Sequence, residues 1–140
     1  MSDFEIEHHT CPDCGQQQDV KVWKTLNVTL DPALREALFK SELNTFRCRK
    51  CGMAGRVKSS LEYHDVARRF CVLYYPAEVI DNDGFLKNFT ADANVIMGSG
   101  SARQGGGDNY QLRPHIVFDL GELVRYVLFR ERLYEIRKNG

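Results

Sequence analysis

The chain has 140 residues, of which 43% are hydrophobic and 11% aromatic, and its 19 basic residues balance 19 acidic ones to a formal net charge of zero. These values are ordinary for a globular protein, and the neutral balance argues against a dedicated nucleic-acid-binding domain, which normally carries a basic excess. No apolar run is long enough to span a bilayer, so we expect no membrane association.

The first ten residues are strongly polar. Asp3, Glu5 and Glu7 stand where the apolar core of an export signal would lie. We therefore expect a cytoplasmic protein, and in that compartment paired cysteines serve metal binding or redox chemistry more often than disulfides. Structural disulfides are the alternative that this expectation disfavours.

Two short motifs of the form Cys-x-x-Cys-Gly are the most informative feature of the chain. They occupy residues 11–15 and 48–52. The two-residue spacing lets both sulfurs of a motif face one ion about 2.3 Å away, and the glycine can adopt the positive φ that closes such a turn. We expect one structural Zn2+ ion, bound by Cys11, Cys14, Cys48 and Cys51.

Two redox alternatives use the same four thiols. Rubredoxin-like electron carriers bind iron with paired hairpins of this kind, and Cys11-Pro12-Asp13-Cys14 is similar to a thiol-disulfide motif. His8 and His9 precede the first motif, and either could replace a cysteine as a ligand. Because four thiolates already complete a tetrahedral shell, we expect both histidines to hydrogen-bond around the site or to lie exposed.

The segment between the two motifs is long enough to hold structure of its own. It has 33 residues, against roughly 15 to 20 in a compact ribbon. Residues 19–29 alternate apolar with polar side chains, which is typical of a half-buried strand. Asp31 and Pro32 predict the N-cap and first position of a short helix. The apolar stripe of this helix comprises Leu34, Ala37 and Leu38.

Five basic side chains crowd the second motif, with no acidic residue among them. They are Arg47, Arg49, Lys50, Arg56 and Lys58. Such a group is typical of a solvated strand pair whose counter-charges lie on a neighbouring segment. It is also typical of a surface that meets the phosphate or carboxylate groups of a partner.

The tripeptide Tyr63-His64-Asp65 is the best candidate for acid–base chemistry. Adjacent residues of an extended segment point to opposite faces, so we expect His64 to be structural instead. Cys71 lies in a predicted strand over residues 68–75 and is expected to be a buried small hydrophobe. No nucleophile elbow, Walker loop or zinc-peptidase motif is present, so a non-enzymatic protein is favoured.

The second half is less regular. Residues 78–92 are acidic and predict a short helix or loop, with three apolar side chains directed inward: Phe85, Leu86 and Phe89. The glycine-rich residues 98–107 predict a surface loop. A strand is expected over residues 112–118, and Pro114 indicates a late start or an edge position for it.

A long helix is predicted to start at Asp119 and Glu122, which resemble a capping box, and to reach about Arg137. Its apolar residues cover more than one face, whereas a surface helix needs only one apolar stripe. The helix is therefore either clamped between two layers or partly exposed to a partner.

The order of these motifs resembles the CpXC-domain family of bacterial and archaeal proteins, named for paired Cys-Pro-x-Cys motifs. The residues that carry the resemblance lie in the first 75 positions: Cys11-Pro12-Asp13-Cys14-Gly15, Trp23, Asp31-Pro32-Ala33-Leu34, Phe46-x-Cys48, Cys51-Gly52 and Tyr63-His64-Asp65. Arg49 stands where a proline would complete the second motif, which makes this turn less rigid and more cationic. The resemblance implies a metal site and no particular activity.

Together these observations predict an α+β fold with a zinc-ribbon-like antiparallel β core, a short inserted helix and a long C-terminal helix. Residues 1–75 would form the ribbon-like region, and residues 76–140 an extension packed into the same domain. The expected function is a non-enzymatic structural-zinc module that engages a protein, or an RNA or DNA, within a larger assembly. No small-molecule substrate is evident, and the redox protein described above is the alternative.

Overall fold

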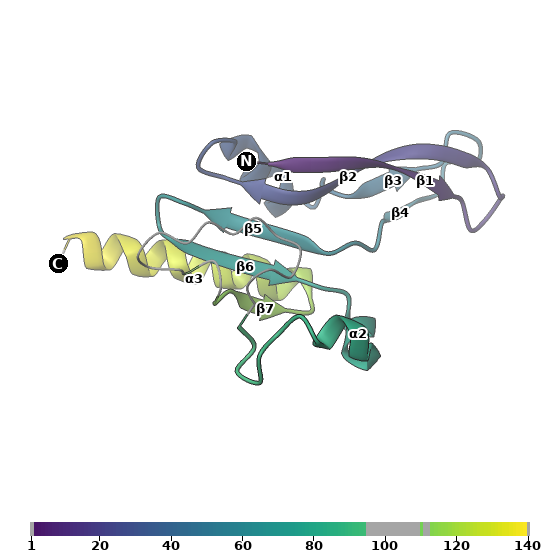
Figure 1. The fold of residues 1–140 in the computed structure, drawn as a ribbon. Coiled ribbons are helices and arrows are strands. Elements are labelled where there is room, and N and C mark those ends of the chain that lie inside the picture. The colour runs from purple at the N-terminus through teal and green to yellow at the C-terminus, as the bar shows by residue number, and fades with distance from the viewer. Residues whose placement is uncertain (1, 95–109, 111–112, 140) are drawn as a thin grey trace.

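The computed structural model describes residues 2–94, 110 and 113–139. The glycine-rich segment 98–107 and the start of the strand predicted over 112–118 lie outside these residues. Figure 1 shows the described elements. In chain order they are β1 (Asp3–Thr10), β2 (Gln17–Asn27), α1 (Pro32–Phe39), β3 (Thr45–Arg47), β4 (Ala54–Arg56), β5 (Leu61–Asp65), β6 (Phe70–Tyr74), the 3-10 helix η1 (Ala77–Asp81), α2 (Asp83–Leu86), β7 (His115–Val117) and α3 (Leu120–Asn139).

Five strands form a mixed sheet in the order β1-β2-β5-β6-β7, and β3 and β4 form a separate hairpin. The predicted α+β class is confirmed. The expected antiparallel pairing holds for β1–β2 and β5–β6, whereas β2–β5 and β6–β7 pair in parallel. Parallel strands need a long crossover between them, and the segment with α1 and the β3–β4 hairpin supplies it between β2 and β5.

One face of the central strands carries the main hydrophobic core. Along β5 the alternate residues Leu61, Tyr63 and Asp65 are buried, while Glu62 and His64 between them are only half-buried. Side chains from α1 and α3 pack on the same core, which includes Leu38, Leu123 and Val127 among its buried residues. The two helices therefore cover one face of the sheet.

The edge strand β1 is an element that the sequence analysis did not predict. Its residues are exposed or half-buried, and Ile6 is 60% exposed. The segment is polar overall, but Phe4, Ile6 and His8 alternate with acidic side chains in the period of two that is typical of a strand. Phe4 packs on Trp23 of β2 with ring centroids 5.1 Å apart, which fixes the strand against its neighbour.

The inserted helix α1 begins where predicted, with Pro32 in its first turn, but Asp31 does not cap it through its side chain. Instead, the side chain of Asn27 binds backbone N–H groups in the turn that precedes the helix. Its carbonyl oxygen accepts hydrogen bonds from the backbone N–H groups of Thr29 (3.2 Å) and Leu30 (3.1 Å). The buried asparagine thus closes the turn that leads from β2 into α1.

The C-terminal helix α3 has the predicted start. The side chain of Asp119 accepts hydrogen bonds from the N–H groups of Gly121 and Glu122, at 2.6 and 3.2 Å. One side of the helix enters the core at Leu123 and Val127, which are both 0% exposed. The last turns reach past the ends of β5 and β6 (Figure 1).

A second side of α3 is exposed and apolar. Phe129 is 57%, Leu133 39% and Ile136 55% exposed. These residues follow the i, i+4, i+7 spacing of one helix face. The apolar residues of α3 thus form two separate stripes, one in the core and one exposed, which explains why they cover more than one face of the helix. None of the helices in the described parts of the chain combines the length and apolar composition that a membrane-spanning segment requires.

The acidic segment forms η1 and α2, as predicted. Phe85 and Phe89 are half-buried against Tyr75, with Phe85 and Tyr75 ring centroids 4.6 Å apart. The prediction that Leu86 points inward is wrong, since it is 44% exposed. In a helix of only one turn, residues 85 and 86 cannot face the same side.

A bidentate ion pair joins α1 to α3. The Nε and NH2 groups of Arg35 donate to the two carboxylate oxygens of Glu131 at 2.7 and 2.8 Å. The side chain of Glu131 is only 16% exposed. We expect Glu131→Ala to lower the free energy of unfolding by about 1–3 kcal/mol, because it removes both of these hydrogen bonds and leaves the half-buried guanidinium with only its pair to the exposed Glu36.

The matched control is Glu135→Ala on the same helix, where the carboxylate lies 4.0 Å from Lys138 and both side chains are well exposed. This change should alter the free energy of unfolding by no more than about 0.5 kcal/mol. Urea denaturation measures both variants. Equal losses in the two would show that the Arg35 pair does not hold the helices together.

Candidate metal centre

The two Cys-x-x-Cys motifs fold into the same turn. Each forms the tip of a hairpin, the first between β1 and β2 and the second between β3 and β4. In both, the N–H of the first cysteine donates to the carbonyl five residues on, and the glycine N–H donates back to the first cysteine. Gly15 and Gly52 both have φ of 77°, as the sequence predicts.

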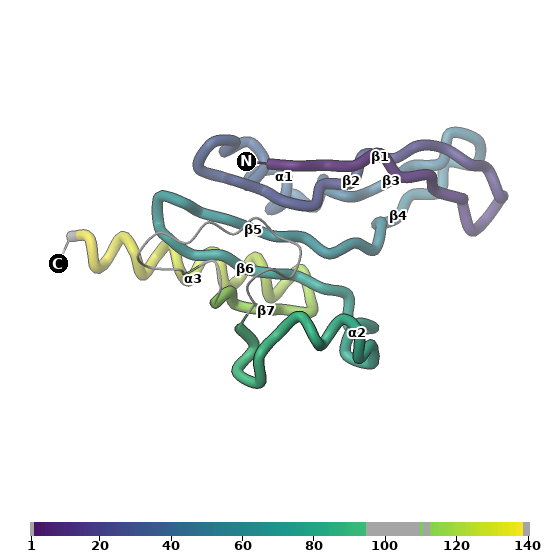
Figure 2. The backbone as a smooth tube through the Cα atoms, in the orientation of Figure 1, coloured from purple at the N-terminus to yellow at the C-terminus, as the bar shows by residue number. Residues whose placement is uncertain are grey.

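The tips of the two hairpins meet at one end of the molecule, far from the C-terminus of α3 (Figure 2). The sulfurs of the four cysteines all lie within 4.8 Å of one another. The shortest contacts cross between the hairpins. Cys11 and Cys51 are 3.6 Å apart, and Cys14 and Cys48 are 3.5 Å apart. None of the five cysteines forms a disulfide.

This arrangement fits a tetrahedral metal ion. With metal–sulfur bonds of about 2.3 Å, the sulfurs of a tetrahedral site are about 3.8 Å apart. The two short sulfur–sulfur distances of 3.5 and 3.6 Å and the upper limit of 4.8 Å bracket that spacing. Four thiols in this geometry could therefore bind a metal ion, and a tetrahedral ion would leave no coordination position open.

The pKa values of Cys48 and Cys51 in the second hairpin are shifted in opposite directions. Hydrogen bonds from the N–H groups of Cys51 and Lys50 outweigh burial and lower the pKa of Cys48 to about 6. The Met53 N–H favours a thiolate at Cys51, but desolvation and the neighbouring thiols raise the pKa of Cys51 to about 12. Close sulfurs cannot all ionise by themselves, so a bound cation is what would allow four thiolates to coexist.

Two amide side chains attach the second hairpin to β2, and sequence reasoning did not identify them. Gln18 donates to the carbonyl of Arg47 at 2.9 Å and accepts from the N–H of Arg49 at 3.1 Å. Asn44 accepts from the N–H of Trp23 at 2.7 Å and donates to its carbonyl at 3.1 Å. No local pattern marks these residues, because their partners lie 21 to 31 residues away in sequence.

A small apolar cluster lies behind the cysteines. Its buried residues are Val20, Val22 and Phe46, with Met53 and Val57 packed around them. The ring of His9 packs at a tilt against Phe46 with ring centroids 4.1 Å apart, and its Nε2 is buried with no hydrogen-bond partner among the described residues. His8 is exposed and bonds Asp19 at 3.0 Å and Gln17 at 2.9 Å, which raises the pKa of His8. Neither histidine belongs to the thiol cluster.

The five cationic side chains predicted as a partner surface fall into two groups. Arg47, Arg49 and Lys50 are exposed at the second hairpin tip, beside the cysteines. Arg56 ends β4, and Lys58 lies in the connection to β5, where its Nζ is 2.8 Å from a carboxylate oxygen of Glu78. The counter-charge on a neighbouring segment is therefore present for Lys58.

The candidate acid–base residues His64 and Asp65 point in different directions. Asp65 is 1% exposed and bonds the N–H and the guanidinium of Arg68 at 3.0 and 2.9 Å, so it closes the β5–β6 turn. The Nε2 of His64 hydrogen-bonds the hydroxyl of Tyr110 instead. The expectation that these neighbours would not share a proton is confirmed. Cys71 is 3% exposed, which confirms the prediction of a buried cysteine.

A family model described as CpXC protein matches residues 9–137. The match covers nearly the whole chain, so this protein belongs to the CpXC family. It extends beyond the first 75 residues on which the sequence resemblance rested. No curated protein and no solved structure matches the chain.

The positive φ of Gly52 allows a test of the turn that carries two of the thiols. A Cβ added here would meet no atom within 4 Å, so a substitution acts through the backbone alone. Gly52→Ala should lower the free energy of unfolding of the metal-loaded protein by about 1–2 kcal/mol. Gly52→Asn is the matched control and should cost less, because asparagine tolerates this conformation better. Chemical denaturation compares the two, and equal losses would contradict the argument.

Proposed function

We propose that this protein is a non-enzymatic binding module in which one structural Zn2+ ion joins two hairpins and the surface around them engages a protein partner. The observation that supports the metal is the convergence of four thiols from Cys11, Cys14, Cys48 and Cys51. Four soft ligands in a closed shell are typical of structural zinc, whereas catalytic zinc keeps an open position.

The ion would stabilise the smaller of the two sheets. The β3–β4 hairpin has only three residues in each strand, and a hairpin of this size is at best marginally stable by itself. The cysteines of its tip face those of the β1–β2 tip, so a shared ion would bind the hairpin to the main sheet. In such sites the free energy of metal binding becomes folding free energy.

Two exposed features support a partner. The first is the cationic tip with Arg49 and Lys50, for which the structure gives no ion pair among the described residues. The second is the apolar stripe of α3, formed by Phe129, Leu133 and Ile136. An exposed apolar stripe favours a protein over RNA or DNA, as does the zero net charge of the chain.

The identity of the metal is tested by analysis of the protein purified from cells grown without added metal. We expect one zinc ion per chain and a colourless solution. Cys11→Ser and Cys48→Ser should each lose the ion and lower the melting temperature of the protein. Cys71→Ser is the matched control, because this cysteine lies outside the thiol cluster, and it should retain the ion.

Other outcomes of this experiment would reject the proposal. Stoichiometric iron with a red colour would favour the rubredoxin-like alternative. A metal-poor protein that reduces disulfide substrates would favour the thiol-disulfide alternative. Unchanged metal content and unchanged melting in both cysteine variants would remove the site altogether.

The partner surface is tested by charge reversal at Arg49 and Lys50 together. The double change to glutamate should leave melting unchanged and reduce capture of the native partner in a salt-dependent manner. Lys40 and Lys87 are exposed and lie away from the tip, so the same double reversal there is the charge-matched control. Capture that persists at full strength would mean that the tip is only solvated, and capture that nuclease treatment abolishes would point to RNA or DNA.

The apolar stripe is tested separately with Phe129→Lys. We expect a folded protein that captures less of its partner, because this side chain is 57% exposed and its loss removes contact area only in the complex. Leu123→Lys is the contrasting variant and should not fold, since Leu123 is 0% exposed. Unfolding of the Phe129 variant would place that residue in the core, against the proposal.

A further inference from the structure

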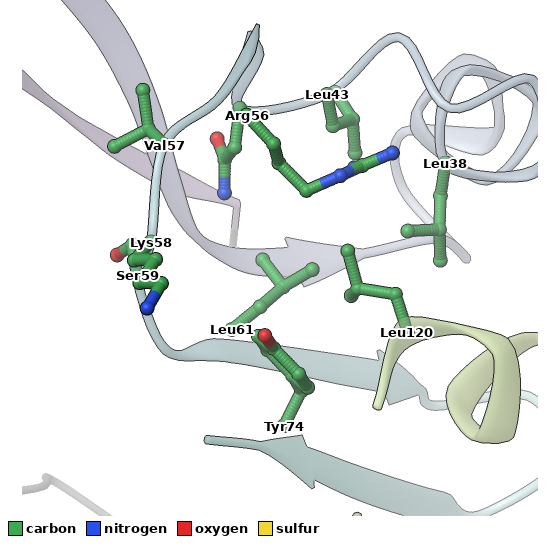
Figure 3. Close-up of a pocket in the computed structure, with 10 residues that line it drawn as sticks. Leu38, Leu43, Arg56, Val57, Lys58, Ser59, Leu61, Tyr74 and Leu120 are labelled. Carbon is green, nitrogen blue, oxygen red and sulfur yellow. The ribbon is translucent and has the colours of Figure 1, made fainter. Parts of the chain in front are cut away.

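A cavity of about 240 Å³ lies where α1, the central strands and the start of α3 come together. Figure 3 shows it between the β4–β5 connection and the two helices. Four leucines from separate parts of the chain form most of its apolar wall: Leu38, Leu43, Leu61 and Leu120. The cavity does not include any of the four clustered cysteines.

Most polar groups around the cavity already have partners. The amide of Asn44 is occupied by the backbone of Trp23. The hydroxyl of Ser59 accepts from Lys24 at 2.8 Å. The ammonium group of Lys58 pairs with Glu78. These groups are therefore not available to a ligand without the loss of an existing bond.

Two hydrogen-bond donors at the cavity remain available to a ligand, the Arg56 guanidinium and the Tyr74 hydroxyl. The guanidinium of Arg56 extends across it, between Leu43 and Leu38 (Figure 3). The hydroxyl of Tyr74 reaches from β6 toward the cavity, next to Leu61, its register partner on β5. Within the described residues no carboxylate pairs with Arg56, and no group hydrogen-bonds the Tyr74 hydroxyl.

The electrostatic environment keeps Tyr74 a donor. Burial and the carboxylates of Asp119 and Glu78 raise the pKa of Tyr74, against the opposing effect of Arg56 and Lys58. The phenol therefore stays protonated at neutral pH. Both carboxylates are already bound, since Asp119 caps α3 and Glu78 pairs with Lys58. Among the described residues that line the cavity, Arg56 therefore carries a positive charge with no carboxylate paired to it.

We propose that this cavity binds small carboxylates that carry an apolar group, with the carboxylate on Arg56 and Tyr74 and the apolar group against the leucines. A planar guanidinium matches a carboxylate with two parallel hydrogen bonds. A phosphate fits less well, because a strongly hydrated dianion gains nothing from an apolar wall. The same ligand chemistry occurs in a free organic acid and in the C-terminal residue of a peptide with an apolar side chain. This inference goes beyond the proposed function, and none of the four clustered cysteines lines the cavity.

The first test titrates the metal-loaded protein with hexanoate and follows the methyl signals of the cavity leucines by NMR. We expect saturable shifts, and binding that is about tenfold or more weaker for Arg56→Met, which keeps the apolar stem and removes the charge. Hexan-1-ol, which has the same chain without the carboxylate, should bind about tenfold more weakly to the original protein. Arg132→Met is the matched control, because Arg132 is exposed and does not line the cavity, and it should bind hexanoate as the original protein does.

A second pair of probes separates the sources of the carboxylate. The peptide acetyl-Gly-Gly-Leu is compared with its C-terminal amide. Tighter binding of the peptide acid than of hexanoate identifies a peptide C-terminus as the ligand, and the reverse identifies a free acid. Either result supports the inference.

Three results would overturn the inference. They are the absence of saturable binding by either acid below about 10 mM, equal affinity of the original protein and Arg56→Met for hexanoate, and, where the peptide acid does bind, equal affinity for its amide. Tyr74→Phe provides an independent test in case Arg56→Met disturbs the fold, because it removes only the hydroxyl group. It should retain the fold and weaken hexanoate binding by a few-fold.

Discussion

The convergence of four sulfurs at two hairpin tips is the constraint on which one end of this structure depends. The β3–β4 hairpin is too short to be stable alone. Apart from the thiols, it is held by a small cluster around Val22 and Phe46 and by the amides of Gln18 and Asn44. Each of these contacts is modest. An ion shared by the four thiols would add a far larger free energy at the point where the two hairpins meet.

The other end of the structure is stabilised by the larger hydrophobic core. The helices α1 and α3 bury leucine and valine side chains against the central strands, and the Arg35–Glu131 pair joins the helices to each other. Loss of a metal ion would therefore act first on the hairpin side of the protein. The buried aspartate Asp65, which closes the β5–β6 turn, belongs to this metal-independent part.

The cavity lies at the junction between these two parts. Arg56 ends the same hairpin that carries Cys48 and Cys51, whereas Leu61 and Leu120 belong to the main core. The position of the guanidinium over the leucines is thus set by how the hairpin sits against the sheet. A metal ion that fixes the hairpin would also fix this cationic group, so the two sites are connected through one short element. The apolar stripe of α3 is separate from both, because none of its residues lines the cavity or belongs to the thiol cluster.

Local chemistry in the sequence was enough to predict that the four cysteines of the two motifs converge, and to predict the glycine turns, the helix starts at Pro32 and Asp119, and the burial of Cys71. These features depend on spacing and on backbone preferences, which act over a few residues. The parallel pairing of β2 with β5, the clamps from Gln18 and Asn44, and the cavity beneath Arg56 could not be predicted. Each joins residues that are distant in the chain, and only the packed fold determines which of them meet.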